Sequence, residues 1–337
     1  MPGLFLLALD EARMNTTDDL IAEPMHQVEE HLSSTLHGTI EEQTVNAMCS
    51  QVIKSGGKRL RPRLALLSYL CLCVDPSDHE MDRAVSFASA VELLHTATLI
   101  HDDVIDHANM RRGTPTLNAT DGNHAAVLAG DYMFTRAFIE FNKIGNREIY
   151  NEVVATVTAL VSGEIEQLRE QGDLGIARKN YYRTIYCKTG ALFSLACCGS
   201  AMLLGASDRE IEALRDYGRM LGEGFQIADD IIDYSSSSPV TGKNSGEDLA
   251  DGRVTLPLII ALEESSGDQR TRLEKAVKED DLDEVKKIMK LTGALDKAQQ
   301  CADTSASGAV KVLSVLPKSQ FSDALETLAF KAAKRSF

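Results

Sequence analysis

Hydrophobic positions recur at spacings of three and four residues along most of the chain. The pattern is clearest over residues 84–106, 148–171 and 206–234, which contain no proline. This spacing places one apolar face along a helix, and Ser207-Asp208 has the composition of a helix N-cap. No convincing run of alternating β-branched residues and no strand–helix–strand rhythm appears. The pattern therefore predicts an all-α protein.

The breaks between the predicted helices are short and rich in Gly, Pro, Ser and Asn, which favour turns. They lie at 55–57, 75–77, 112–115, 118–123, 145–146, 172–175 and 235–246. None is long or biased enough for an interdomain linker, so residues 21–337 are interpreted as a single large helical domain. Residues 1–20 are expected to form an irregular leader, too brief in its apolar part for a signal or a membrane span. The Ser/Gly stretch 235–246, which carries Lys243, is predicted to be a mobile lid.

Composition narrows the classes of partner. With 35 basic and 50 acidic residues in 337, the formal charge is −15, which disfavours nucleic acid because phosphate backbones require basic surfaces. It also disfavours docking on anionic lipid. The seven cysteines form no regular framework and sit mostly in apolar runs, which indicates core packing in a cytoplasmic protein rather than disulfides or zinc.

The first candidate site is the cluster Asp102-Asp103-Val104-Ile105-Asp106. On a helix Asp102 and Asp106 lie one turn apart on the same face, with Asp103 beside them. Carboxylates without His or Cys favour a hard cation, above all Mg²⁺, which keeps waters and shares itself with phosphates. A solvated acidic face is the alternative, and the apolar residues that precede the cluster argue against it.

The second cluster repeats this spacing at Asp229, Asp230 and Asp233, again within an apolar helical segment. Two clusters with the same DDxxD spacing, facing each other across a cavity, would clamp a diphosphate through several Mg²⁺ ions.

Basic residues accompany the first cluster. The segment Gly56-Gly57-Lys58-Arg59-Leu60-Arg61-Pro62 carries three cations, and Arg111-Arg112 follows the cluster at a turn. Arginine suits bidentate recognition of phosphate, and lysine adds a point charge. Each basic group alone could be a solvated surface patch. In an acidic protein, their proximity to aspartates indicates a small polyanion, and no Walker or dinucleotide-binding motif points to a nucleotide.

Three motifs together resemble the trans-isoprenyl diphosphate synthases: GGKRLRP, the H-x6-DDxxD-x4-RRGxPT block and the FQxxDDxxDY block. The resemblance extends from about residue 20 to the C-terminus. Intervening segments such as LAGDYMFTRAF and YCKTGALF are similar to bacterial long-chain, octaprenyl-type members. The resemblance implies a helical bundle with a central cavity, which is the isoprenoid synthase fold, and it implies a homodimer. It also implies condensation of isopentenyl diphosphate onto an allylic diphosphate such as farnesyl diphosphate, giving a long all-trans product, octaprenyl diphosphate, for quinone side chains.

The resemblance also implies roles for individual residues. Asp102, Asp106, Asp229 and Asp233 would hold Mg²⁺, with Asp103 and Asp230 in support. Isopentenyl diphosphate would be bound by Lys58, Arg61, His95 and Arg112, and the allylic diphosphate by Arg111, Lys188, Thr189, Gln226 and Lys243. Lys188 and Gln226 would also take part in catalysis. Arg253 stands where many relatives have Lys, which leaves its diphosphate contact in doubt.

Product length is expected to depend on the depth of an apolar tunnel below the first cluster. Ala97 and Thr98, about one helical turn from that cluster, are small and would leave the tunnel open. Phe141, Phe138 and Val153 are candidate floor residues, although each could be an ordinary core residue. Small residues at this depth of the tunnel therefore predict a long product.

Two other functions remain open from the sequence. A class I terpene cyclase shares the fold and one aspartate cluster, but usually has a mixed Asn/Ser/Glu motif as its second metal site. A non-catalytic subunit of a heteromeric synthase typically lacks one DDxxD cluster. Retention of both clusters and of Lys58, Arg61 and His95 favours elongation.

Overall fold

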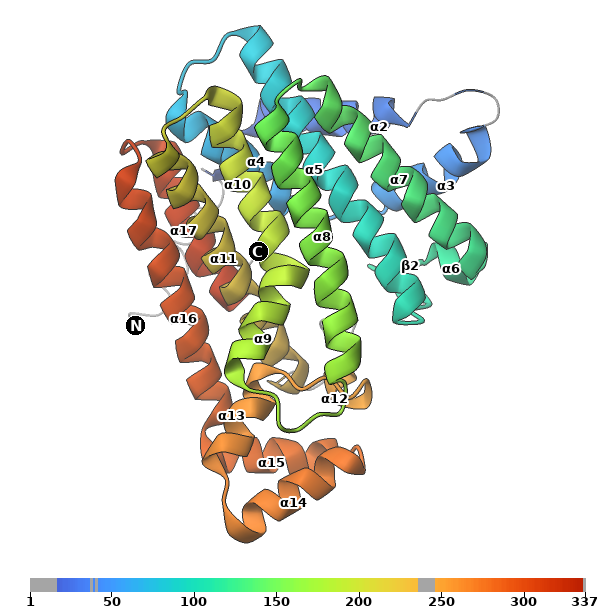
Figure 1. The fold of residues 1–337 in the computed structure, drawn as a ribbon, viewed down its shortest axis with the longest axis vertical. Helices are drawn as coiled ribbons and strands as arrows, with labels where there is room; N and C mark the ends of the chain where they lie inside the picture. The colour runs from blue at the N-terminus through green and yellow to red at the C-terminus, as the bar shows by residue number, and fades with distance from the viewer. Residues whose placement is uncertain (1–16, 37–38, 40–41, 236–245, 336–337) are drawn as a thin grey trace. The chain divides into compact units, whose positions relative to one another are not determined.

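In a computed structural model of the chain, residues 17–36, 39, 42–235 and 246–335 are described, and they are helical almost throughout (Figure 1). The helices are α2 (Ala22–Thr35), α3 (Gln43–Lys54), α4 (Leu60–Leu72), α5 (Asp78–Ile105), α6 (Leu117–Thr120), α7 (Asn123–Lys143), α8 (Arg147–Glu170), α9 (Arg178–Ile185), the π-helical turn η2 (Tyr186–Gly190), α10 (Ala191–Leu204), α11 (Asp208–Ser235), α12 (Glu247–Ala250), α13 (Leu256–Glu264), α14 (Gly267–Lys278), α15 (Leu282–Thr292), α16 (Ala294–Val312), the 3₁₀ turn η3 (Leu313–Val315) and α17 (Gln320–Lys334). The all-α prediction is confirmed. Residues 1–16 of the predicted leader and 236–245 of the predicted lid, Lys243 included, lie outside the described residues.

One short sheet interrupts the helices within the described ranges. Strand β1 (Met110–Arg111) pairs antiparallel with β2 (Thr114–Pro115), and Arg111 lies opposite Thr114. Arg112 and Gly113 form the turn with φ of 52° and 77°, the left-handed values that tight hairpins require. The sequence predicts a turn here but not the ladder, because two residues per strand are too few for an alternating pattern.

The long predicted helices agree with α8 and α11 to within two residues, but α5 begins at Asp78 rather than at residue 84. A capping box explains the earlier start. Glu80 accepts hydrogen bonds from the backbone N–H of Ser77 (2.9 Å) and from its hydroxyl (2.7 Å). These contacts satisfy groups at the helix end that apolar periodicity does not register.

Contacts divide the described residues into two compact units. Unit 1 comprises the residues up to Glu152, Leu195–Leu214 and Ser314–Leu325, and unit 2 comprises Val153–Ser194, Arg215–Leu313 and Glu326 onward. The interpretation of residues 21–337 as a single domain stays a prediction.

Unit 1 is built around α5, which lies beside α7 (Figure 1). The His101 ring nitrogen Nε2 lies 3.1 Å from the carbonyl oxygen of Val127, and a Cβ at Gly130 would collide with this ring. Phe87 of α5 packs edge-on against Phe141 of α7, with ring centroids 5.9 Å apart. Close packing of these two helices fixes the end of α5 that carries the first aspartate cluster.

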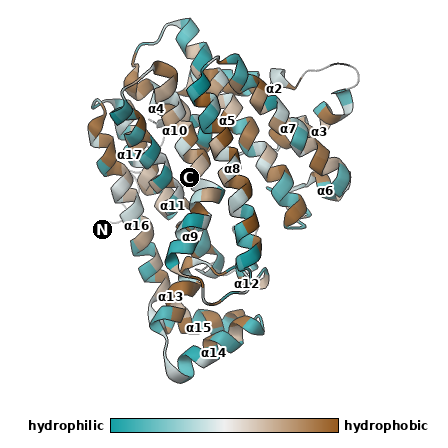
Figure 2. Ribbon diagram, viewed as in Figure 1, coloured by the Kyte–Doolittle hydropathy of each residue, from teal (hydrophilic) through white to brown (hydrophobic). Residues whose placement is uncertain are grey.

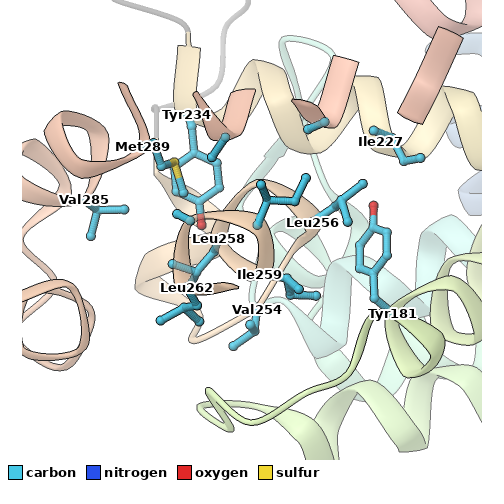
Figure 3. Packing of buried hydrophobic residues seen from close by; sticks show 14 of the residues in the cluster. Tyr181, Ile227, Tyr234, Val254, Leu256, Leu258, Ile259, Leu262, Val285 and Met289 are labelled. Atoms are coloured by element: carbon cyan, nitrogen blue, oxygen red, sulfur yellow. The ribbon is translucent and has the colours of Figure 1, made fainter. Parts of the chain in front are cut away.

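Unit 2 has its core around α13, whose residues Leu256 to Leu262 are all buried. A helix that is apolar on every side belongs in an interior, and Figure 3 shows α13 side chains among those of Tyr181, Tyr234 and Met289. Most other helices alternate hydrophobic and hydrophilic stretches (Figure 2), as expected for helices with one buried face.

The cysteines and the most apolar helical stretch belong to the interior. None of the seven cysteines forms a disulfide and five are buried, in agreement with the prediction of core packing. In the described part of the chain, one helical stretch, Arg178–Leu204, is long and apolar enough to cross a membrane, and most of its apolar window is buried. The core helix of a soluble protein has the same features, so this stretch is weak evidence for a membrane span.

Candidate active site

The first aspartate cluster lies at the C-terminal end of α5. The backbone N–H of Asp106, the C-cap residue, donates to the carbonyl oxygen of Asp102 at 2.8 Å, so helical geometry continues through the cluster. Asp102 and Asp106 therefore share one face, as predicted. Asp102 is half-buried and Asp106 exposed, whereas Asp103 is only 6% exposed. The outer two carboxylates are accessible and the middle one is not.

The middle carboxylate holds an arginine of the hairpin. Nε of Arg111 donates to Oδ1 of Asp103 at 2.6 Å. Burial raises the pKa of Asp103, and the charge and hydrogen bond of Arg111 oppose that shift. The hairpin is fixed in turn by Thr116, whose hydroxyl donates to the carbonyl oxygen of Ala108 at 2.6 Å. Arg111 is thus held at the end of α5 by a partly exposed ion pair.

Arg112 reaches the glycine pair that precedes α4. Its guanidinium donates to the carbonyl oxygen of Gly56. A Cβ at Gly57, where φ is 154°, would lie 2.9 Å from Cζ of Arg112. The close approach therefore requires glycine at position 57, and it joins the hairpin to the segment that carries Lys58 and Arg61.

Arg59, the middle cation of that segment, is committed to the protein itself. Its guanidinium donates to Glu29 from Nε (2.7 Å) and Nη2 (3.2 Å), to Glu92 from Nη1 (3.1 Å) and to the carbonyl oxygen of Ile53 (2.9 Å). Arg59 is buried and has a φ of 48° at the N-cap of α4. It anchors the basic segment to α2, α3 and α5.

Arg61, His95 and Arg112 share one electrostatic environment around Glu92, a carboxylate only 4% exposed. Burial lowers the pKa of Arg61 to about 10, against the attraction of Glu92. Burial and the nearby arginines, Arg61 first, hold the pKa of His95 well below its usual value, so the imidazole is neutral at pH 7. The structure thus brings together three of the four residues predicted to bind isopentenyl diphosphate. The fourth, Lys58, is exposed on the same segment.

The second cluster lies near the end of α11, in unit 2. Asp233 accepts hydrogen bonds of 3.1 Å from the backbone N–H groups of Glu247 and Asp248, which begin α12. Asp229 accepts a hydrogen bond of 2.5 Å from Nη2 of Arg335, whose guanidinium carbon lies 4.1 Å from the ring centroid of Phe225. Asp229 and Asp233 are both half-buried, so the outer aspartates are again accessible.

The middle aspartate of this cluster, Asp230, is 3% exposed and accepts two hydrogen bonds. One comes from the hydroxyl of Tyr181 at 2.6 Å, and the other from Nε2 of Gln226 at 2.9 Å. Oε1 of Gln226 accepts a hydrogen bond of 2.9 Å from the hydroxyl of Thr189. Two residues predicted to bind the allylic substrate, Thr189 and Gln226, are therefore linked to Asp230.

Lys188 and Thr189 lie in the π-helical turn η2, which interrupts the helical run between α9 and α10. Such turns are rare and occur often at functional sites. Nζ of Lys188 lies 3.1 Å from Oε1 of Gln167 and 3.4 Å from Oε2 of Glu164, both on α8. The ammonium group is thereby held by two side chains that the sequence analysis did not single out.

Glycine allows the π-helical turn to approach α11. A Cβ at Gly222 would lie 2.7 Å from Cα of Gly190, and a Cβ at Gly218 would lie 2.5 Å from the carbonyl oxygen of Phe193. Gly218 and Gly222 are one turn apart on the same face of α11. Because glycine has no side chain, this face of α11 lets the hydroxyl of Thr189 come within hydrogen-bond distance of Gln226.

Arg253 contacts acidic residues that follow the second cluster. Its Nη2 lies 3.1 Å from Oδ2 of Asp251 and its Nη1 lies 3.5 Å from Oδ1 of Asp248. Its backbone N–H also donates to the carbonyl oxygen of Asp248 at 2.7 Å. These contacts order the segment after α12.

The outer aspartates suit a hard divalent cation that keeps other ligands. Over the ranges that the structure describes, no group of three or more His, Cys, Asp and Glu side chains is arranged to hold a metal ion. Each cluster instead offers two accessible carboxylates one turn apart. Such a donor set fits Mg²⁺, which binds through one or two carboxylates together with waters and substrate phosphates.

The predicted chain-length residues lie in or near the interior. Ala97 and Phe141 are fully buried, and Phe138 packs against Tyr150 with ring centroids 6.2 Å apart. Thr98 is half-buried, and its hydroxyl donates to the carbonyl oxygen of His95 at 2.7 Å. Val153 is buried and belongs to unit 2.

Five residues that contact the predicted site residues were not among the candidates from the sequence: Glu92, Gln167, Glu164, Tyr181 and Arg335. Glu92 carried a usable signal, since it is a lone charge in an otherwise apolar helical run three residues before His95. Tyr181 carried none, because a tyrosine in a helical run is most simply a core residue.

Comparisons with known proteins place these features in a family. Residues 42–292 match the family model described as polyprenyl synthetase. The chain is 35% identical over 336 residues to an octaprenyl diphosphate synthase of Haemophilus influenzae, covering 98% of each chain. Its fold is similar to a decaprenyl diphosphate synthase of Rhodobacter capsulatus, with a TM-score of 0.88 and 32% identity over 95% of this chain and 98% of the other. It is also similar to a polyprenyl synthase of Caulobacter crescentus in complex with calcium and isoprenyl diphosphate. That match has a TM-score of 0.87 and 32% identity over 95% of this chain and 97% of the other.

Proposed function

This chain belongs to the polyprenyl synthetase family of trans-prenyltransferases, and from that premise we propose how its residues divide the work of chain elongation. The enzyme condenses isopentenyl diphosphate head to tail onto an allylic diphosphate. One shared design carries the proposal. In each aspartate cluster the outer carboxylates are accessible, while the middle one is buried and bonded to a residue assigned to the allylic substrate.

The enzyme depends on a divalent metal, as its family does, and the proposed ion is Mg²⁺. Asp102 and Asp106 of the first cluster, and Asp229 and Asp233 of the second, are the proposed metal ligands. When bound, the ions neutralise the charge that develops on the leaving diphosphate. Asp103 and Asp230 support the site by positioning Arg111 and Gln226 rather than by binding metal.

The isopentenyl diphosphate is assigned to Lys58, Arg61, His95 and Arg112, without a metal. Arg61 and Arg112 supply fixed positive charge beside Glu92. Because His95 is neutral at pH 7, its imidazole contributes a hydrogen bond and no charge. Two guanidinium groups with planar N–H donors match the oxygens of a diphosphate.

The allylic diphosphate is assigned to Arg111, Lys188, Thr189, Gln226 and Lys243. Breaking the allylic C–O bond releases diphosphate and leaves an allylic cation. The double bond of isopentenyl diphosphate attacks this cation, a carbon–carbon bond forms, and the new cation loses a proton to the released diphosphate. The carbonyl oxygen of Gln226 and the π-helical turn at Thr189 supply the dipoles that stabilise the cation.

The proposed product is a long chain, octaprenyl diphosphate, made from a farnesyl diphosphate primer. Ala97, close to the first cluster on α5, leaves room for the growing chain, and Thr98 lies beside it. Phe141, which packs against Phe87, is the proposed floor on α7.

The enzyme is proposed to form a homodimer through α8. Val154, Val161, Ile165 and Leu168 are between 47% and 55% exposed and lie on one face of this helix. Val153, Leu160 and Gly163 lie on the other side and are buried. A helix that is apolar on two sides needs a second surface to cover its exposed apolar face. The proposed surface is a second copy of the chain. A cytoplasmic location and a quinone side chain as the destination of the product complete the proposal.

Incubation of the purified protein with Mg²⁺, farnesyl diphosphate and labelled isopentenyl diphosphate tests this function. The expected result is a ladder of prenyl diphosphates that ends at the octaprenyl product. Cyclised hydrocarbons would favour a terpene cyclase, and failure to incorporate label would favour a non-catalytic subunit.

A further inference from the structure

Four side chains of unit 2 form one continuous hydrogen-bond chain. The hydroxyl of Tyr181 on α9 donates to Oδ2 of Asp230 at 2.6 Å, and Nε2 of Gln226 donates to Oδ1 of the same carboxyl group at 2.9 Å. At the other end, the hydroxyl of Thr189 donates to Oε1 of Gln226 at 2.9 Å. Tyr181, Asp230 and Thr189 are all buried, so bulk water does not compete for these bonds.

This chain gives the Gln226 amide a direction. Both oxygens of Asp230 accept from donors, so the NH₂ group of Gln226 must face Asp230 and its carbonyl oxygen must face Thr189. A carbonyl oxygen has two lone pairs, and Thr189 uses one of them. Reversal of the amide would set its carbonyl oxygen against a carboxyl oxygen that accepts. Asp230 therefore selects one of the two orientations that a glutamine amide can adopt.

The hydroxyl of Tyr181 is not needed to fill the core. Tyr181 belongs to the apolar cluster around α13, where a phenylalanine ring would pack in the same space. Figure 3 shows the hydroxyl pointing toward the helix that carries Ile227, which is α11. A buried hydroxyl destabilises the folded protein unless it forms a hydrogen bond. The hydroxyl of Tyr181 forms this bond with Asp230.

We propose that Tyr181 is a positioning residue for the chemical step, which acts through Asp230 to keep the carbonyl oxygen of Gln226 directed at the allylic cation. The inference rests on the role of Gln226 proposed above. Asp230 is the acceptor that orients the amide, and Tyr181 fixes the rotation of Asp230. Because both residues act through Gln226, both act on the reaction rate rather than on substrate affinity.

Single-turnover rates with preloaded farnesyl diphosphate test the proposal. Tyr181→Phe removes only the hydroxyl, and the rate is expected to fall about tenfold, because a buried hydrogen bond to Asp230 is lost. Asp230→Asn keeps the shape but adds an NH₂ donor that can face the Gln226 carbonyl and reverse the amide, so a larger fall, about 100-fold, is expected. The KM for isopentenyl diphosphate should stay within about twofold of wild type in both variants.

Tyr182→Phe is the matched control, because the ring of Tyr182 packs against that of Tyr181 with centroids 5.6 Å apart and takes no part in this chain. It should keep the wild-type rate. Thermal unfolding of all three variants separates a lost hydrogen bond from a damaged core.

The background variant Gln226→Ala distinguishes the inference from the function on which it rests. If Tyr181 acts through Gln226, then Tyr181→Phe should not slow Gln226→Ala any further. An equal slowing in both backgrounds, or a wild-type rate for Tyr181→Phe, would overturn the role of Tyr181. A wild-type rate for Gln226→Ala itself would instead overturn the proposed role of Gln226.

Discussion

Arg111 donates a hydrogen bond of 2.6 Å from its Nε to Oδ1 of Asp103, the buried middle residue of the first aspartate cluster. The second cluster has the corresponding arrangement, since its buried middle residue, Asp230, accepts a hydrogen bond from Gln226. In both clusters the middle carboxylate is turned about 100° around the helix from the first outer carboxylate and about 60° from the second. The DDxxD spacing therefore combines two accessible carboxylates with one that positions a neighbour.

Asp103→Asn is expected to weaken binding of the allylic substrate rather than to abolish turnover. Asparagine still accepts from Arg111, but the charge assistance is lost, which corresponds to about 1 kcal/mol at this partly exposed pair. The KM for farnesyl diphosphate should rise about fivefold with little change in kcat. Steady-state kinetics measure this, with the exposed Asp121→Asn as control. A loss as severe as that of Asp102→Asn would mean that Asp103 is itself a metal ligand.

Substitution of Ala97 tests the tunnel. Ala97→Phe should shorten the product, because the bulky ring lies about 7.5 Å along α5 from Asp102. Ala90 is buried on the same face of α5, two turns further from the cluster, so Ala90→Phe should give a product of intermediate length. Chromatography of dephosphorylated products measures both. Unchanged length in Ala97→Phe, with turnover retained, would refute the tunnel at that level.

His95 should make stability depend on pH. Its pKa is held well below 6.5 in the folded protein, so below about pH 6.5 the unfolded chain binds a proton that the folded protein does not. Its contribution to stability is therefore present at pH 7 and lost as the pH falls. Thermal unfolding from pH 7.5 to pH 5.5 should show a smaller fall in Tm for His95→Gln than for wild type. Parallel Tm curves would show that His95 titrates normally in the folded protein.

The exposed apolar face of α8 should control the oligomeric state. Val161→Asp and Leu168→Asp place a charge on that face, so they should convert the dimer into monomers in light scattering coupled to gel filtration. Leu291→Asp is the control, because Leu291 is also an exposed apolar residue but lies on α15. Dimers that persist in both α8 variants would place the interface elsewhere.

The sequence predicts the helices and the shared face of the outer aspartates in each cluster well, because both depend on local pattern. Residue spacing alone predicts that Asp102 shares a helix face with Asp106, and Asp229 with Asp233, because residues four apart lie one turn apart on the same face. The start of α5 was misplaced because Ser77 and Glu80 stabilise the helix end through side chains, outside any apolar periodicity.

Partners far apart in the sequence could not be predicted in this way. Nothing in the pattern around Arg59 distinguishes it from Lys58 or Arg61, yet its contacts with Glu29 and Glu92 give it a structural role. The pairing of Tyr181 with Asp230 likewise depends on how α9 packs against α11. Tertiary contacts, which no local pattern encodes, decide which members of a motif face the substrate.

A double-mutant cycle on Asp102 and Asp229 tests most directly whether the two clusters act on one allylic diphosphate. Each of Asp102→Asn and Asp229→Asn should lower kcat/KM by about 100-fold or more, since each removes a ligand of the metal that stabilises the leaving group. Groups that act as a unit show strongly non-additive losses. The double variant should therefore be little worse than the more severe single variant. Losses that multiply would show that the two clusters act independently, and would contradict a shared diphosphate.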